Sequence, residues 1–211
     1  MNRSAHSWPL RLAVLFLGMQ SLAMAQEAPL QFSASIHGGL VTSQIHGDQI
    51  SGFNKFGYTV GASIDMRRAP DSGLRFGMFL SQKGSRRVPD TKNGDFNAWS
   101  YRFTYIDLPL MHTWDSNGWW LGVGLQPSLL VRGEEDFYGN GFVELTYLQL
   151  KPIDLGAIVA IGRTLSDGLA LDVRLSQSAI PISERPEQPI QRWNNFMMNM
   201  ALQWMVTWSF S

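Results

Sequence analysis

The sequence predicts an all-β protein, an eight-stranded antiparallel up-and-down transmembrane β-barrel with a filled polar lumen. Three observations predict it. Apolar and polar residues alternate along eight segments, the connections between these segments alternate between short and long, and tryptophans lie near segment ends. Alternation with a period of two is typical of a strand with one apolar and one polar face. A closed barrel with lipid outside and polar side chains inside accounts for this pattern along the whole chain.

Residues 1–25 are predicted to be a cleavable signal peptide, and residues 26–211 a single outer-membrane barrel domain. Arg3 and Arg11 supply positive charge beside a short apolar stretch, and an Ala-Met-Ala sequence ends at Ala25. We therefore expect cleavage between Ala25 and Gln26. The apolar stretch is shorter than the ~20 residues of a membrane-spanning helix, which disfavours an uncleaved N-terminal anchor.

The first four strands are predicted over residues 31–42, 55–67, 74–84 and 98–114. The second is the clearest, because alternation runs from Lys55 to Arg67 without an error. In the fourth, the apolar residues are odd-numbered up to Tyr105 and even-numbered from Ile106 onward. A slip of one residue is what a β-bulge produces, so a bulge is expected near these two residues. The odd-numbered aromatic residues before it are then expected to face lipid.

The last four strands are predicted over residues 119–132, 153–161, 169–178 and 195–210. The apolar phase of the sixth continues backward through Val143, Leu145 and Tyr147, whereas Pro152 argues against smooth pairing there. The start of this strand is therefore left open. Eight strands is an even number, as expected for a single-chain bacterial barrel.

The connections support this count independently. Short ones are predicted at residues 68–73, 115–118 and 165–168, the last two carrying Asn-Gly and Asp-Gly turn sequences. Long ones are predicted at residues 43–54, 85–97, 133–142 or beyond, and 181–192. Outer-membrane barrels have short periplasmic turns and longer external loops. Both termini are therefore expected in the periplasm.

Tryptophans are predicted to form an aromatic girdle, because indole prefers the membrane–water interface. Trp99 and Trp193 lie at the predicted outer ends of strands, and Trp114, Trp119 and Trp208 at the inner ends. The alternative is that the aromatic residues fill a soluble core, which two bands at opposite strand ends fit poorly.

The lumen of an eight-stranded barrel is just wide enough for side chains to fill it. Charged residues of both signs fall on the inward faces, together with Gln126 and Arg132. The predicted lumen charge network is Asp65, Arg67, Arg75, Lys83, Asp154, Asp172 and Arg174. Such a set could form an ion pathway, but ion pairs that fill the barrel are the favoured interpretation, since buried charges need partners.

Several function classes find no support. Without Arg3 and Arg11 the mature chain has 15 basic residues against 17 acidic ones, so no basic surface for nucleic acid is indicated. There is no Cys, which rules out disulfides and thiolate chemistry. His37, His46 and His112 lie on separate segments without metal-ligand spacing. No catalytic, cofactor-binding or metal-binding residue, and no cofactor, is therefore predicted.

The chain resembles the PorT-like outer-membrane β-barrel family, the Bacteroidetes-type outer membrane protein beta-barrel domain. The resemblance covers the mature chain and is most specific in Ser-Gln-Lys-Gly at residues 81–84 and Tyr-Ile-Asp-Leu-Pro-Leu at residues 105–110. Shorter similar pieces lie at residues 38–40, 57–61, 154–156 and 171–174. Such barrels often end on an aromatic residue, whereas here Ser211 follows Phe210. The resemblance implies an integral outer-membrane barrel and no defined activity.

The leading prediction is thus a non-enzymatic barrel in the cell outer membrane that acts in surface interaction, envelope integrity or secretion. Its expected partners are outer-membrane lipid and lipopolysaccharide, the barrel assembly machinery during biogenesis, and secretion-system or surface partners of the loops. The alternative is a narrow pore or a transporter of small hydrophobic ligands. A lipid-modifying enzyme is less favoured.

Overall fold

The computed structural model describes residues 29–48, 50, 52–94, 96–146, 148–183 and 196–210. The chain divides into two units, Met1–Leu30 and Gln31–Ser211, and the barrel is the second of them. The predicted cleavage site at Ala25 and Gln26 lies outside the described residues.

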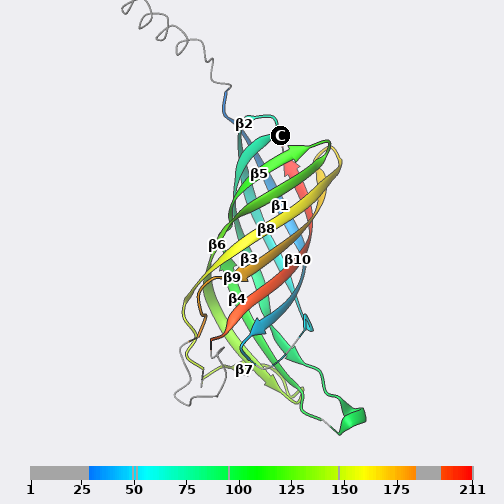
Figure 1. The fold of residues 1–211 in the computed structure, drawn as a ribbon, viewed down its shortest axis with the longest axis vertical. Helices are drawn as coiled ribbons and strands as arrows, with labels where there is room; N and C mark the ends of the chain where they lie inside the picture. Colours follow the sequence, from blue (N-terminus) through cyan, green and yellow to red (C-terminus); the bar gives the residue numbers. More distant parts are fainter. Residues whose placement is uncertain are drawn as a thin grey trace, which may run out of the picture. The chain divides into compact units, whose positions relative to one another are not determined.

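The barrel is closed and antiparallel. Its strands are β1 (Gln31–His46), β2 (Lys55–Ala69), β3 (Ser72–Arg87), β4 (Trp99–Asp107), β5 (Leu110–Ser116), β6 (Trp119–Phe137), β8 (Ile153–Ser166), β9 (Leu169–Ser178) and β10 (Met198–Phe210), with the two-residue β7 (Val143–Glu144) beside β6. β1 pairs with both β2 and β10, which closes the ring (Figure 1). β4 and β5 follow one another between β3 and β6, and together they occupy the place of one strand in the barrel wall. The predicted eight-stranded barrel is confirmed.

In the fourth predicted strand, the set of residues that face inward differs from the prediction. Tyr101, Phe103 and Tyr105 are 4%, 0% and 0% exposed and point into the barrel. Odd-numbered residues face inward through β4 and again in β5, so the chain makes no slip at Tyr105 and Ile106. The bulge lies on the facing strand, where Thr104 pairs with Arg132 but Tyr105 pairs with Leu130. Both the expected bulge position and the expected lipid-facing aromatics are therefore wrong.

Pro109 interrupts the hydrogen bonding between β4 and β5 without changing the direction of the wall. Proline has no backbone N–H to donate to a neighbouring strand. Its carbonyl still accepts from the N–H of Gly77 at 3.0 Å, and the N–H of Leu108 donates to the carbonyl of Pro127 at 2.8 Å. The two short strands therefore stay joined to both neighbours.

The short connections lie at the end of the barrel that carries the chain's C-terminus, here called the short-turn end (Figure 1). Asn117 and Gly118 have φ values of 51° and 78°. Two positive φ values in a two-residue turn suit the right-handed twist of a hairpin, and Asn-Gly is the preferred pair. The opposite end, called the long-loop end, carries the connections after β1, β3, β6 and β9.

The sixth wall strand, β8, begins at Ile153 and does not extend back through Leu145. Among the described residues of the connection before it, only Val143 and Glu144 form a strand, paired with β6. Leu145 and Leu150 instead pack against buried residues inside the long-loop end. Their apolar character thus serves an internal cluster rather than a longer lipid-facing strand.

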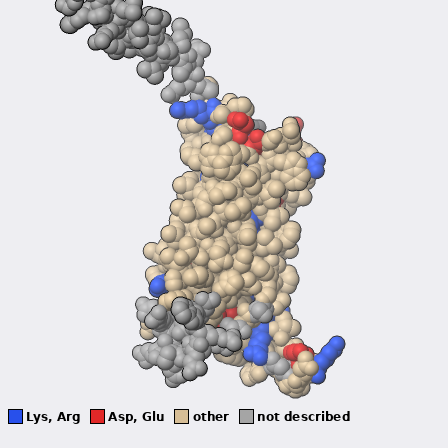
Figure 2. All heavy atoms as spheres, in the orientation of Figure 1, with Lys and Arg blue, Asp and Glu red and all other residues tan. Residues whose placement is uncertain are grey.

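The outer wall of the barrel is apolar. Outward side chains such as Phe32, Leu40, Val60 and Leu125 are 63%, 63%, 50% and 58% exposed. Figure 2 shows a broad middle band with few charged side chains, and most of the visible Lys, Arg, Asp and Glu lie toward the two ends. A continuous apolar band on a closed barrel is the arrangement that hydrocarbon requires. In the described part of the chain, no helix has the length and hydropathy to span a bilayer.

Candidate functional site

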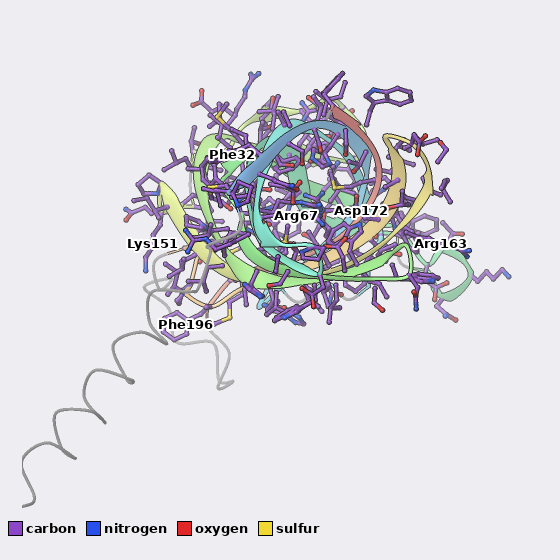
Figure 3. All side chains as sticks on the ribbon, turned by 90° about the horizontal axis from the view of Figure 1, so that it is seen from above. Phe32, Arg67, Lys151, Arg163, Asp172 and Phe196 are labelled. Atoms are coloured by element: carbon purple, nitrogen blue, oxygen red, sulfur yellow. The ribbon has the colours of Figure 1, made fainter. Side chains whose placement is uncertain are left out.

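Side chains fill the lumen, as the view along the barrel shows (Figure 3). Arg67 and Asp172 lie inside the ring, whereas Phe32 and Arg163 lie at its outside. The lumen and its long-loop mouth are the candidate functional site, because the predicted charge network and most buried polar groups lie there.

The middle of the lumen holds two buried ion pairs. Nε of Arg75 donates to Oδ1 of Asp65 at 2.8 Å across the β2–β3 pair. Nε of Arg174 donates to Oδ1 of Asp172 at 2.6 Å. All four side chains are at most 8% exposed. Their opposite charges compensate one another where water is scarce, which is what makes buried charge tolerable.

His37 connects the strands around the second pair. Its Nδ1 lies 2.7 Å from Oγ1 of Thr207 and its Nε2 lies 2.8 Å from Oγ of Ser63. Oγ1 of Thr207 donates to Oδ2 of Asp172 at 2.7 Å. The order Ser–His–Thr–Asp superficially resembles a nucleophile relay. His37, Ser63, Thr207 and Asp172 are 5%, 3%, 4% and 3% exposed, so no substrate reaches this serine.

A third ion pair lies nearer the long-loop end. Nζ of Lys83 donates to Oδ1 of Asp107 at 2.8 Å, and Oγ of Ser81 donates to Oδ2 of the same carboxylate at 2.6 Å. Lys83 also lies 5.1 Å from the ring centre of Tyr105. The sequence network lacked Asp107. The even-numbered apolar phase from Ile106 onward already places Asp107 on the inward face, so the alternation alone could have revealed it.

Asp154 has hydroxyl and amide partners instead of a cation. Its Oδ2 accepts from Oγ of Ser178 at 2.8 Å and from Nδ2 of Asn199 at 3.1 Å. The same amide nitrogen donates to the hydroxyl oxygen of Tyr105 at 3.1 Å. This group ties β8, β9 and β10 to β4 across the lumen, so Asp154 belongs to a polar cluster separate from the ion pairs.

Arg67 and Arg132 lie outside the buried network. Arg67 pairs with Asp115 at 2.9 Å, and both side chains are 27% exposed at the short-turn end. Arg132 was expected to point inward, but its side chain is 65% exposed and pairs with Glu134 at 3.3 Å. The β6 bulge causes this, because the extra residue turns Arg132 to the outside.

An apolar cluster closes the lumen at the long-loop end. Its buried members are contributed by strands β1 and β4 and by the connection between β9 and β10: Ile45, Tyr101, Phe103, Tyr105, Ile182 and Met197. Leu130, Leu145, Leu148 and Leu150 pack against them. Alternation alone does not distinguish an apolar interior from an apolar exterior, so the sequence did not predict this apolar plug.

Four of the five predicted girdle tryptophans lie in the described residues. Trp114, Trp119 and Trp208 are outward and 45%, 48% and 48% exposed near the short-turn end. The prediction for Trp99 is wrong, because this residue packs against the apolar plug, with its ring centre 5.0 Å from that of Tyr101. Its odd position on β4 turns it inward. Trp193 lies outside the described residues.

No group of three or more His, Cys, Asp or Glu is arranged to hold a metal ion within the described segments. The carboxylates of the lumen are instead engaged by Arg, Lys, hydroxyl and amide groups. Chemically, this arrangement joins the strands across the lumen and fills it with paired side chains.

The family model of the outer membrane protein beta-barrel domain matches residues 24–184. This chain belongs to that family. The match places the protein in the outer membrane, in agreement with the apolar outer wall. No curated protein matches the chain significantly.

The chain is similar to several solved structures, of which three are described. Neisserial surface protein A is 14% identical, with a TM-score of 0.51, and the alignment covers 86% of this chain and 99% of that one. Ail of Yersinia pestis, solved with the heparin analogue sucrose octasulfate, is 10% identical, with a TM-score of 0.46 over 85% and 99% of the two chains. OprG of Pseudomonas aeruginosa is 14% identical, with a TM-score of 0.43 over 87% and 98%. At these identities, the likeness to the Neisserial protein concerns the fold alone.

Proposed function

We propose that this protein is a non-enzymatic outer-membrane barrel that presents its long-loop end to the cell exterior for surface interaction. The observation that carries the proposal is the filled lumen. Buried ion pairs occupy its middle and the apolar plug occupies its long-loop mouth. Because the lumen is filled, the loops and the rim are the parts of the barrel that remain accessible for function.

The orientation follows from the connections. Long loops on the cell surface and short turns in the periplasm are the rule for such barrels, so both termini are proposed to lie in the periplasm. Envelope integrity and secretion are further roles consistent with this placement, and the narrower PorT-like resemblance stays a prediction. Lipid, lipopolysaccharide and the barrel assembly machinery are the proposed partners.

Protease mapping on intact cells tests the orientation. Added protease is expected to cut the connection at residues 88–98 or 138–152, and to leave the turn at Asn117 uncut. A tag inserted after Asn93 should be stained by antibody on unpermeabilised cells, whereas one at Asn117 should be stained only after permeabilisation. The opposite staining pattern would overturn the surface role.

Planar-bilayer recording separates this proposal from the transport alternative. The filled lumen is expected to give no steady single-channel current, whereas long-lived large openings would favour a pore. The enzyme alternative has its own measurement. Lipid A profiles by mass spectrometry, with and without overexpression, are expected to be identical.

A further inference from the structure

A cavity lies at the long-loop rim, outside the lumen network. It has a volume of about 310 Å³, and its lining combines cationic and aromatic side chains with a single acidic one. The cationic residues are Lys55, Arg86 and Arg87, and the acidic one is Asp136. We call this cavity the rim pocket. Its lining has an excess of positive charge in a protein whose overall charge is balanced.

Lys55 is the buried cation of the rim pocket. It is 7% exposed. Its Nζ donates to the backbone carbonyl of Phe56 at 2.9 Å and lies 5.7 Å from the ring centre of Phe142. Neither partner carries a negative charge, and no described carboxylate pairs with Lys55. A buried cation held only by a carbonyl and a ring face lacks the anion that normally offsets its desolvation.

Two neighbouring groups lack partners as well. Arg86 is exposed and forms no ion pair with any described residue. Trp99 lines the same cavity, and its indole Nε1 is buried without an acceptor among the described residues. An indole N–H can only donate, so a buried one without an acceptor has a free-energy cost. A ligand with negative oxygen atoms would supply what Lys55, Arg86 and Trp99 all lack.

The position of the rim pocket indicates where that ligand comes from. Phe56 also lines the cavity, and its side chain is 66% exposed on the outer wall. Tyr58, the next outward residue of β2, is 45% exposed on the same face. The cavity thus lies where the apolar wall ends, at the level of lipid headgroups, where Tyr and other amphipathic rings also lie.

We propose that the rim pocket binds the phosphate group of a membrane lipid headgroup, in the leaflet at the long-loop end. Phosphate oxygens accept from ammonium, guanidinium and indole N–H groups together, and the ionised donors give the stronger hydrogen bonds. With the proposed orientation, the lipid is the phosphorylated glycolipid of the outer leaflet. Binding of a lipid phosphate needs only the barrel and its apolar band, whereas the assignment to the outer-leaflet lipid rests on the orientation given under the proposed function.

A lipid titration followed by native mass spectrometry tests this binding site. The full-length barrel in a neutral maltoside detergent is titrated with bisphosphorylated lipid A and with the same lipid after removal of both phosphates. The Arg86→Gln and Trp99→Phe variants are compared with Lys92→Gln. Lys92 lies in the short η1 helix (Thr91–Asn93) of the same end, outside the cavity, and its change removes an equal charge.

The phosphorylated lipid is expected to bind the parent protein at least tenfold more tightly than the dephosphorylated one. Arg86→Gln is expected to weaken binding about tenfold, Trp99→Phe less, and Lys92→Gln not at all. Heat-modifiable gel migration confirms that each variant is folded.

Equal affinities of Arg86→Gln and Lys92→Gln, or equal binding of the two lipids, would overturn the proposal. A third arm adds inorganic phosphate. Displacement of the lipid by millimolar phosphate would show a site for free anions and overturn the lipid assignment. If the titration shows no lipid binding, the result of the protease mapping is unaffected, so the two proposals can fail independently.

Discussion

Arg174 and Asp172 form an ion pair between two residues of one strand, with Nε of the arginine 2.6 Å from Oδ1 of the aspartate. Both side chains point inward from β9 and are at most 1% exposed. Arg174 also lies 3.2 Å, through a terminal guanidinium nitrogen, from Nδ1 of His37 on β1. This pair within β9 thereby also contacts β1, so its loss should destabilise the contacts between strands across the lumen.

Replacing one member of this pair should destabilise the barrel strongly. Arg174→Met leaves Asp172 buried without its cation, which costs about 3–5 kcal/mol of unfolding free energy. The double variant Arg174→Met with Asp172→Leu removes both charges and is expected to recover at least half of that loss. Urea unfolding in lipid vesicles, followed by heat-modifiable migration, measures both. Equal losses in the two proteins would contradict the ion-pair account.

The apolar band predicts a depth-dependent cost for charge on the outer wall. Leu125 is 58% exposed near the middle of the apolar stretch of β6, and Val131 is 57% exposed at its end, next to the charged Arg132. Leu125→Arg is expected to cost about 2–4 kcal/mol, and Val131→Arg at most about 1 kcal/mol. Folding yields and urea midpoints in vesicles measure the difference. A larger loss at Val131 would place the membrane elsewhere on the wall.

Two adjacent glycines provide a test of backbone approach. A Cβ on Gly39 would lie 2.1 Å from the carbonyl oxygen of Trp204, whereas a Cβ on Gly38 would meet nothing within 4 Å. Gly39→Ala forces β1 and β10 apart and should destabilise by about 1–3 kcal/mol. Gly38→Ala adds a lipid-facing methyl and should be close to neutral. Equal urea midpoints for the two variants would disprove the close approach.

The apolar plug should behave as a protein core. Phe103 is 0% exposed, so Phe103→Ala leaves a cavity and is expected to cost about 3–5 kcal/mol. Phe96 is 69% exposed in the connection before β4, and Phe96→Ala serves as the matched control with little expected effect. Thermal gel-shift midpoints report both. Were Phe103→Ala as mild as its control, the aromatic residues of β4 would not face inward.

The strand periodicity predicted the wall well because one physical rule governs it. Between Lys55 and Arg67 the outward residues meet hydrocarbon and the inward ones meet charges, so apolar and polar residues report the two faces directly. The short turn at Asn117 and Gly118 was predicted equally well, because both residues adopt the positive φ values that their residue types favour.

The same rule reverses at the long-loop end, and there the sequence prediction went wrong. Beyond the apolar band the outward residues, such as Arg102, meet polar surroundings, while Phe103 and Tyr105 meet the apolar plug. In this part of β4 the polar residues face outward and the apolar residues face inward, which is the reverse of the arrangement within the apolar band. The pattern therefore resembled a bulge in β4, although the extra residue lies in β6. Arg132 was misjudged because this extra residue turns its side chain to the outside.

The length of β6 has a consequence for what approaches the cell. Its 19 residues rise about 3.3 Å each, and with a tilt of about 40° the strand climbs roughly 45 Å along the barrel axis. The hydrocarbon layer takes up only about 25 Å of that height. The remainder passes through the lipid headgroup layer, up to the rim pocket at the end of the strand, so a large protein such as an antibody would contact paired backbone before it reached the hydrocarbon.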